Sequence, residues 1–225
     1  MNRARLVDTR SPRDPEGVVL ALHGGAAREG SPVVSPAQLS VLRMIPVARR
    51  LARAGRGRLA VLRLLNSSRG WVDRHTPVDD TIWALGQVRE RYGDLPVSLV
   101  GHSLGGRAAL LAGEQEGVRS VVALNPWVYP DQSGDLRGRP TLIVHGLADR
   151  IALPDRSAAL ARRLARTTDV GYIAIPDAKH AMLRHGRRFE TYASEFVVAT
   201  LLGRDGLRLS DPVAAVLDGA AFVDG

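Results

Sequence analysis

The sequence predicts an α/β fold with a mostly parallel central sheet and helices on both faces. Two observations lead to this class. Short apolar runs alternate with segments of helical periodicity along almost the whole chain of 225 residues. Nearly all of the runs are continuously apolar, which is typical of parallel strands that are buried on both faces. A chain of this length is also long enough to bury a sizeable core.

The predicted strands are short and are separated by segments that leave room for a helix. The first strand gives only a weak signal, whereas the others are apolar runs that end in small or polar residues. In chain order, the predicted strands are residues 3–8, 18–22, 59–65, 97–100, 118–124, 141–144 and 170–175.

Helices are predicted between the strands from their end signals and their apolar stripes. Pro46 is expected to begin a helix that Gly55 ends, because proline favours the first helical position and glycine the position after the last. Thr76 is expected to cap a helix with proline and aspartate in its first turn. Residues 26–36 contain two prolines and are expected to form a loop. Apolar positions mark further helices at Leu104, Ala108 and Leu111, at Leu160 and Leu164, and at Phe189, Tyr192 and Phe196.

The last part of the chain differs from this alternating pattern. We therefore expect one domain over residues 1–203 and a C-terminal tail over residues 204–225. Ser210, Asp211 and Pro212 can begin a short helix in this tail. The sequence leaves open whether the tail docks on the domain or stays loose.

The segment from Gly101 to Gly105 places a serine on a tight turn between a strand and a helix. It reads Gly-His-Ser-Leu-Gly, which is the G-x-S-x-G pattern. The two glycines let the strand and the helix approach closely, so that the hydroxyl of Ser103 projects from the turn. The helix N-terminus directs unpaired N–H groups and positive charge towards it. Ser103 is thus predicted to lie beside a site for an anion.

Two further reactive side chains follow later strands. Asp149 comes after the strand at 141–144, and His180 after the strand at 170–175. The carboxyl ends of parallel strands share one edge of a sheet, where ligands gather. A serine needs a base to take its proton as it attacks, an imidazole can be that base, and a carboxylate can hold the imidazole. The order serine, aspartate, histidine is the one that acyl-transfer enzymes of this topology use.

Each of these assignments has a competitor nearby. His185 lies five residues after His180, but at or inside the last predicted helix, so we assign the base to His180. Asp155 follows a proline and is better explained as an acidic residue in the first turn of a helix. We therefore assign the acid to Asp149.

Four segments together resemble the α/β-hydrolase-fold serine hydrolases, and in particular lidless members of the esterase and dienelactone-hydrolase type. They are residues 23–25, 101–105, 145–149 and the loop that contains His180. The resemblance implies that Ser103 is the nucleophile, Asp149 the acid and His180 the base. It also implies an oxyanion hole made by the backbone N–H groups of Leu104 and of Gly25 or Ala26. The connection between residues 124 and 141 is too short for the cap domain that many relatives insert there.

The resemblance implies a serine hydrolase that cleaves a small soluble carboxylic ester or thioester through an acyl-enzyme on Ser103. An acyltransferase with the same triad is the alternative, and a ligand-binding member of the fold without catalysis is a third hypothesis. Aromatic and basic residues near the predicted edge are candidates for substrate binding. They are Trp71, Trp127, Tyr129, Arg28 and Arg69. Core packing explains the aromatic residues equally well, and solvation is the simpler explanation of the arginines.

The composition indicates which partners and cofactors the protein is expected to lack. The formal net charge is +8, but the arginines are dispersed and no aromatic-interleaved basic segment accompanies them, so we expect no nucleic-acid partner. The chain has no cysteine and no cluster with metal-ligand spacing, so we expect neither a metal nor a cofactor. We also expect a cytoplasmic protein without a membrane partner, because no apolar stretch is long enough to be a signal peptide or a span. The oligomeric state is not indicated.

Overall fold

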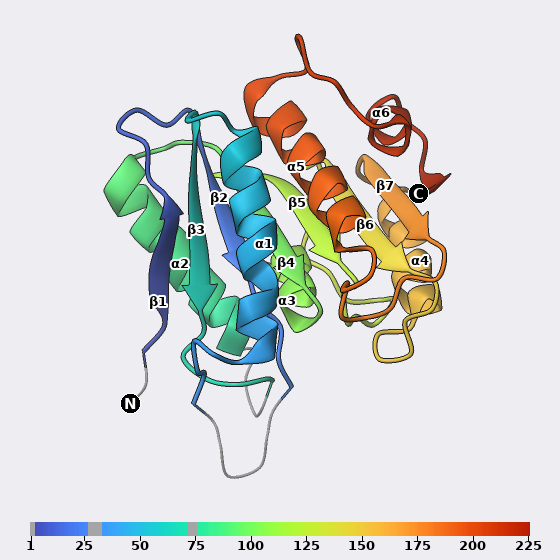
Figure 1. The fold of residues 1–225 in the computed structure, drawn as a ribbon, viewed down its shortest axis with the longest axis horizontal. Coiled ribbons are helices and arrows are strands. Elements are labelled where there is room, and N and C mark those ends of the chain that lie inside the picture. The colour runs from blue at the N-terminus through green and yellow to red at the C-terminus, as the bar shows by residue number, and fades with distance from the viewer. Residues whose placement is uncertain (1–2, 27–32, 72–75) are drawn as a thin grey trace.

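Residues 3–26, 33–71 and 76–225 are described by a computed structural model. They form an eight-stranded sheet in the order β1-β3-β2-β4-β5-β6-β7-β8 (Figure 1). All neighbouring pairs are parallel except β1 and β3, which are antiparallel. The strands are β1 Arg5–Arg10, β2 Gly17–Leu22, β3 Leu59–Leu65, β4 Val97–His102, β5 Val118–Leu124, β6 Thr141–Gly146, β7 Val170–Ile175 and β8 Phe222–Asp224.

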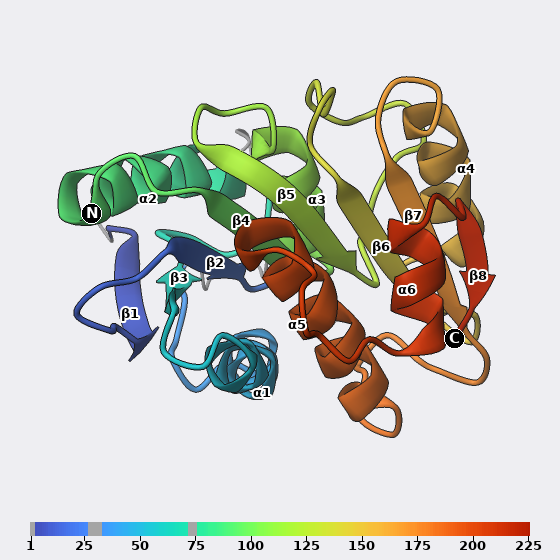
Figure 2. The ribbon, with the colours of Figure 1, turned by 90° about the horizontal axis from the view of Figure 1, so that it is seen from above.

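Helices cover both faces of the sheet, as Figure 2 shows from above. One face carries α1 (Leu39–Ala54), α5 (Gly186–Leu202) and α6 (Asp211–Leu217). The other carries α2 (Thr76–Tyr92), α3 (Leu104–Ala112) and α4 (Pro154–Leu164). The predicted class, a mostly parallel sheet between two layers of helices, is confirmed.

Two hydrophobic cores explain why most of the strands are largely apolar. In β2, Val18, Leu20 and Leu22 belong to the core beneath α2, α3 and α4. The alternate residues Val19 and Ala21 belong to the core beneath α1, α5 and α6. Successive side chains of a strand point to opposite faces, so a strand covered on both faces needs apolar residues at every position.

The expected start of the first helix is wrong. α1 begins at Leu39, and Pro46 lies inside it. Proline in a helix interior removes one hydrogen bond and costs about 3 kcal/mol. The two extra turns bury Val41 and Met44, and burial of each such side chain is worth about 1.5–3 kcal/mol. The burial therefore offsets the cost of the proline.

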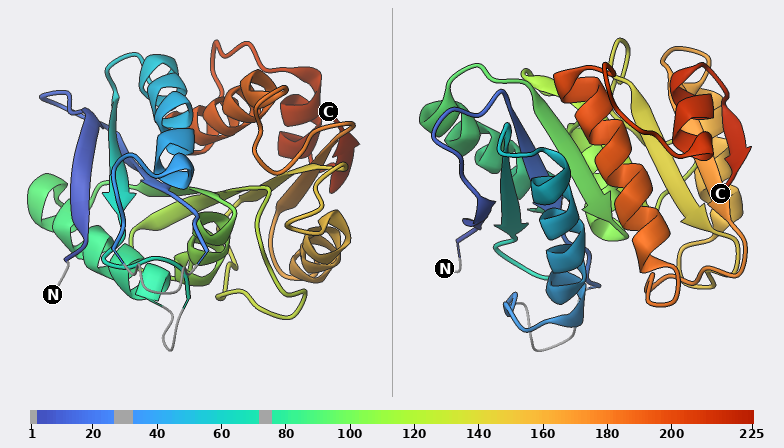
Figure 3. Two further views of the ribbon diagram at one scale, coloured as in Figure 1. Left: turned by 60° about the horizontal axis from the view of Figure 1, so that its bottom comes forward. Right: turned by 45° about the horizontal axis from the view of Figure 1, so that its top comes forward.

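The C-terminal residues pack against the rest of the chain (Figure 3). In α6, Val213 is fully buried in the same core as α5. Val216 lies over β7, where a Cβ placed on Gly171 would be 2.0 Å from its Cγ1 atom. The chain then adds β8 in parallel to β7. The sequence does not predict β8, because three residues are too few to show a period.

The segment between β5 and β6 is the place where the sequence predicts no cap domain. Residues 125–140 contain no helix and no strand. The predicted lack of a cap domain is confirmed for this part of the chain. Among the helices described, none has both the length and the apolar character needed to cross a bilayer.

Candidate active site

Ser103 lies on a strained turn between β4 and α3. Its backbone angles are φ 57° and ψ −121°, a conformation that costs a non-glycine residue about 1–3 kcal/mol. The two glycines of the pattern have no space for a side chain. A Cβ on Gly101 would lie 2.1 Å from the carbonyl oxygen of Gly105, and one on Gly105 would lie 2.3 Å from that of Leu22. Close packing of the turn against β2 therefore holds the serine in this conformation.

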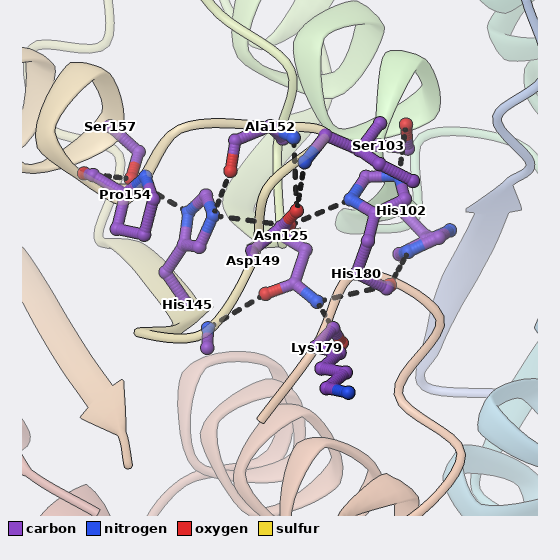
Figure 4. A network of polar contacts seen from close by, with 12 residues as sticks. His102, Ser103, Asn125, His145, Asp149, Ala152, Pro154, Ser157, Lys179 and His180 are labelled. Atoms are coloured by element: carbon purple, nitrogen blue, oxygen red, sulfur yellow. Dashed lines mark hydrogen bonds and ion pairs between the residues drawn. The ribbon is translucent and has the colours of Figure 1, made fainter. Parts of the chain in front are cut away.

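The three predicted reactive side chains meet at the carboxyl edge of the sheet (Figure 4). The Oγ atom of Ser103 lies 2.9 Å from Nε2 of His180. The Nδ1 atom of His180 lies 2.7 Å from Oδ2 of Asp149. A carboxylate can only accept, so Nδ1 carries the proton and Nε2 is free to accept the hydrogen bond from the serine hydroxyl. The serine, the imidazole and the carboxylate thus form one hydrogen-bonded chain.

Asp149 is buried but well supplied with donors. Its Oδ1 atom accepts hydrogen bonds from the N–H groups of Ile151 and Ala152, at 2.8 and 3.0 Å. Its Oδ2 atom lies 3.4 Å from Nε2 of His145, in addition to the contact with His180. Burial alone would raise the pKa of this carboxyl, but the hydrogen bonds from His145, His180 and the backbone outweigh it and lower the pKa. The carboxylate therefore stays ionised.

His145 holds the loop that carries Asp149. Its Nε2 atom lies 3.0 Å from the carbonyl oxygen of Ala152, to which the N–H donates. Its Nδ1 atom lies 2.7 Å from Oγ of Ser157 in α4. The side chain is completely buried. The end of β6, the acid loop and the first turn of α4 are thus fixed to one another through one imidazole.

Asn125 connects three loops at the end of β5. Its Nδ2 group donates to the carbonyl oxygens of Lys179 and His180, at 3.2 and 3.1 Å. Its Oδ1 atom accepts from the N–H of Gly146 at 2.8 Å. The residue is fully buried and has φ 41°, a conformation that asparagine tolerates better than most residues. Asn125 therefore positions the loop that carries Lys179 and His180, called the histidine loop below, against the end of β6.

His102 supports the histidine loop from the other side. Its Nε2 atom lies 2.9 Å from the carbonyl oxygen of His180, and the two rings are 5.0 Å apart. Burial, together with the neighbouring imidazole of His180, lowers the pKa of His102 to about 3. His102 is therefore neutral, with the proton on Nε2 donated to the carbonyl oxygen.

The backbone groups expected to hold an oxyanion lie beside Ser103. Gly25, Ala26 and Leu104 all line the cavity in front of the serine. Leu104 is the first residue of α3, so its N–H has no acceptor within the helix. His23 fixes the other loop: its Nδ1–H donates to the carbonyl of Gly24 at 2.6 Å, and its Nε2 accepts from the N–H of Asn66 at 3.2 Å.

Comparisons with known proteins bear on the fold. No protein-family model matches the sequence, and no curated protein is detectably similar to it. Solved structures do match. Est1E from Butyrivibrio proteoclasticus, solved with ferulic acid, has a TM-score of 0.65 at 16% identity, over 88% of this chain and 95% of that one. XC6422 from Xanthomonas campestris, described as a serine hydrolase without a lid, has a TM-score of 0.64 at 19% identity, over 87% of each chain. The esterase Pf2001 from Pyrococcus furiosus has a TM-score of 0.65 at 16% identity, over 83% and 82%.

The chain has the α/β-hydrolase fold. The two competing residues lie at the starts of helices. His185 immediately precedes α5, and Asp155 lies in the first turn of α4. The hydrogen-bonded chain that starts at Ser103 includes neither of them. In the described ranges, no group of three or more histidine, aspartate or glutamate side chains could hold a metal ion.

A cavity of about 720 Å³ lies in front of Ser103 in this α/β-hydrolase-fold protein. The three aromatic residues expected near the substrate, Trp71, Trp127 and Tyr129, line it. Arg69 is not among the lining residues, and its Nε donates instead to the carbonyl of Val33 at 3.0 Å. Arg28, the other basic candidate, lies outside the described residues.

Two arginines that sequence reasoning missed line the cavity. Arg43 comes from α1 and Arg107 from α3. A signal for Arg107 was present, because it is the one charged residue in the apolar helix Leu104–Ala112. Arg43 gives no such signal, since it lies in a helix with several other arginines.

Proposed function

We propose that this protein is a serine hydrolase that cleaves small carboxylic esters or thioesters through an acyl-enzyme on Ser103. One observation carries the proposal: Ser103, His180 and Asp149 form a continuous hydrogen-bonded chain with contacts of 2.9 and 2.7 Å. These distances are within the range in which a base can take a proton from a nucleophile. The esterases and serine hydrolases among the structural neighbours support the same reaction class.

In the proposed first half-reaction, the Oγ atom of Ser103 attacks the carbonyl carbon as its proton moves to Nε2 of His180. Asp149 accepts the hydrogen bond from Nδ1 and stabilises the imidazolium that forms. The negative oxygen of the tetrahedral intermediate is held by the N–H of Leu104 and by that of Gly25 or Ala26. The bond to the leaving group then breaks, and His180 returns its proton to the departing alcohol or thiol.

In the second half-reaction, water replaces the leaving group. His180 takes a proton from the water as the hydroxide attacks the acyl-enzyme, and later returns it to the Oγ atom of Ser103. The free carboxylic acid leaves. Residues 125–140 form no helix or strand, so this segment adds no cap domain at the carboxyl edge of the sheet.

The cavity supports an acyl or alcohol group of moderate size. Its volume of about 720 Å³ is in the range of pockets that bind small organic molecules. Aromatic side chains supply its apolar wall. The neighbour Est1E was solved with ferulic acid, a phenolic acid of a size that such a cavity would accommodate.

Turnover of a series of aryl and alkyl esters and thioesters tests the proposal. We expect Ser103→Ala to abolish the acyl-enzyme burst and His180→Ala to lower kcat by a factor on the order of 10⁴–10⁶. His185→Ala is the matched control and is expected to change kcat by less than a factor of about 3. Burst kinetics that survive Ser103→Ala would refute the proposal. If added alcohols, amines or thiols capture the acyl group in place of water, the proposed function changes to that of an acyltransferase.

A further inference from the structure

Arg107 is a buried cation beside the proposed nucleophile. It follows Ser103 by one helical turn, as the hydrogen bond of 3.1 Å from its N–H to the carbonyl of Ser103 shows. Its side chain lines the same cavity, although the residue is only 7% exposed. Arginine is seldom buried to this degree without a partner of opposite charge.

Aromatic rings surround the guanidinium of Arg107. Its Cζ atom lies 4.3 Å from the ring centre of Trp71, 5.1 Å from that of Tyr129 and 5.6 Å from that of Trp127. The electron-rich faces of aromatic rings attract a cation, but they carry no net negative charge. These rings, the aromatic cage of Arg107, therefore contact the guanidinium without supplying a negative charge to balance it.

Arg107 donates few hydrogen bonds to the described part of the chain. Within it, the guanidinium donates one, from Nη2 to Oε1 of Gln132, whereas an arginine side chain can donate five. Its Nε is buried without an acceptor. No carboxylate of the described residues lies within ion-pair distance of it. Burial lowers the pKa of the guanidinium from its ordinary value.

The charged side chains that line the cavity in the described part of the chain are both arginines. They are Arg43 and Arg107, and none of the described lining residues is an aspartate or a glutamate. Arg43 likewise has no carboxylate partner in the described ranges. A cavity lined by charges of one sign raises the local concentration of ligands of the other.

We propose that Arg107 and its aromatic cage form an anion subsite that selects esters with a carboxylate on the group next to the scissile carbonyl. This inference rests on the proposed function and specifies its substrate class. The planar fork of a guanidinium matches a carboxylate. One guanidinium that already donates to Gln132 suits a monovalent carboxylate better than a phosphate dianion. The aromatic rings would contact the carbon chain between the ester and the carboxylate.

Matched ester pairs test this selectivity. The p-nitrophenyl half-esters of succinate, glutarate and adipate carry a terminal carboxylate, and p-nitrophenyl butanoate, pentanoate and hexanoate are neutral counterparts. We expect the unmutated protein to hydrolyse one of the half-esters with a kcat/KM about 10-fold or more above its neutral counterpart, which is the scale of one hydrogen bond between charged groups. Equal kcat/KM values within all three pairs would overturn the proposal.

Variants of Arg107 test whether this residue causes the preference for anionic esters. Arg107→Gln removes the charge and is expected to bring the anionic-to-neutral ratio to about 1, whereas Arg107→Lys keeps the charge without the fork and retains part of the preference. Arg150→Gln is the control, because Arg150 is an exposed arginine near the acid loop that does not line the cavity. A ratio that Arg107→Gln leaves unchanged would overturn the proposal. If Arg107→Gln does not fold, Arg107→Lys provides the test. An anionic-to-neutral ratio in Arg107→Lys equal to that of the unmutated protein would then overturn the proposal.

Equilibrium binding separates this inference from the proposed hydrolysis. In the Ser103→Ala background, monomethyl glutarate is expected to bind about 10-fold or more tightly than neutral dimethyl glutarate in isothermal titration calorimetry. Adding Arg107→Gln should remove the difference. Retained selective binding in a protein without turnover would remove the hydrolase proposal and leave the anion subsite. Turnover of esters with equal binding of the two glutarates would remove the anion subsite alone.

Discussion

Replacement of His102 by glutamine should reduce the loss of unfolding free energy that the protein shows as the pH falls from 8 to 5. His102 is buried against the ring of His180, with Arg43 and Asp149 acting on it electrostatically, and its pKa is lowered to about 3. In the unfolded chain a histidine has a pKa of about 6.5. Between about pH 6.5 and pH 3, His102 is therefore protonated in the unfolded state and neutral in the folded state. Stability contributed by the neutral His102 is present above pH 6.5 and is lost as the pH falls.

The size of this effect follows from the pKa difference. At pH 5, about 1.5 units below the pKa of the unfolded chain, the loss amounts to about 2 kcal/mol relative to pH 8. Glutamine does not titrate and can still donate to the carbonyl of His180. We expect the free energy of unfolding of His102→Gln to fall by about 2 kcal/mol less between pH 8 and pH 5 than that of the unmutated protein.

Urea unfolding at pH 8, 7, 6 and 5 measures this difference directly. The pKa of His23 is also lowered by burial, but His23 is present in both proteins and cancels from the comparison. The lowered pKa of Asp149 keeps that group ionised over the whole range, so it contributes no slope. Parallel stability profiles for the two proteins would refute the reasoning, because His102 would then take up its proton equally in the folded and unfolded states.

Two further predictions concern the residues that shape the site. Gly105→Ala is expected to destabilise the protein by about 1–3 kcal/mol and to lower ester turnover, because the new Cβ would lie 2.3 Å from the carbonyl oxygen of Leu22. The control Gly86→Ala has no atom within 4 Å and lies in α2, so it should stabilise by about 0.5–1 kcal/mol; equal effects in urea unfolding would contradict this account. Asn125→Ala leaves the N–H of Gly146 without its acceptor and should cost about 1–3 kcal/mol together with a lower kcat, whereas unchanged kinetics would show that the histidine loop does not depend on it.

Much of the fold could be predicted because burial leaves a direct trace in the sequence. The strands β2 to β7 are largely apolar, since each contributes side chains to two cores. The steric demands at Gly101 and Gly105 leave an equally direct trace around Ser103. The positions of Asp149 and His180 at the sheet edge followed from topology alone, since parallel strands end on the same side.

Other features depend on contacts between distant segments and leave no local trace. Pro46 is a strong local signal for a helix start, but burial of the turns before it outweighs that signal. β8 exists because β7 offers a free edge. The three hydrogen bonds of Asn125 reach segments 21 to 55 residues away. The environment of Arg107 is likewise assembled from rings on two separate segments, those of Trp71 and of Trp127 and Tyr129.

The most direct test of the central claim is the intact mass of the protein after brief treatment with a fluorophosphonate. These reagents form a stable adduct with a serine that a neighbouring base activates. The account predicts one adduct on the unmutated protein and none on Ser103→Ala. A folded protein that gains no adduct, or an adduct that persists in Ser103→Ala, would contradict the claim that Ser103 is the activated nucleophile.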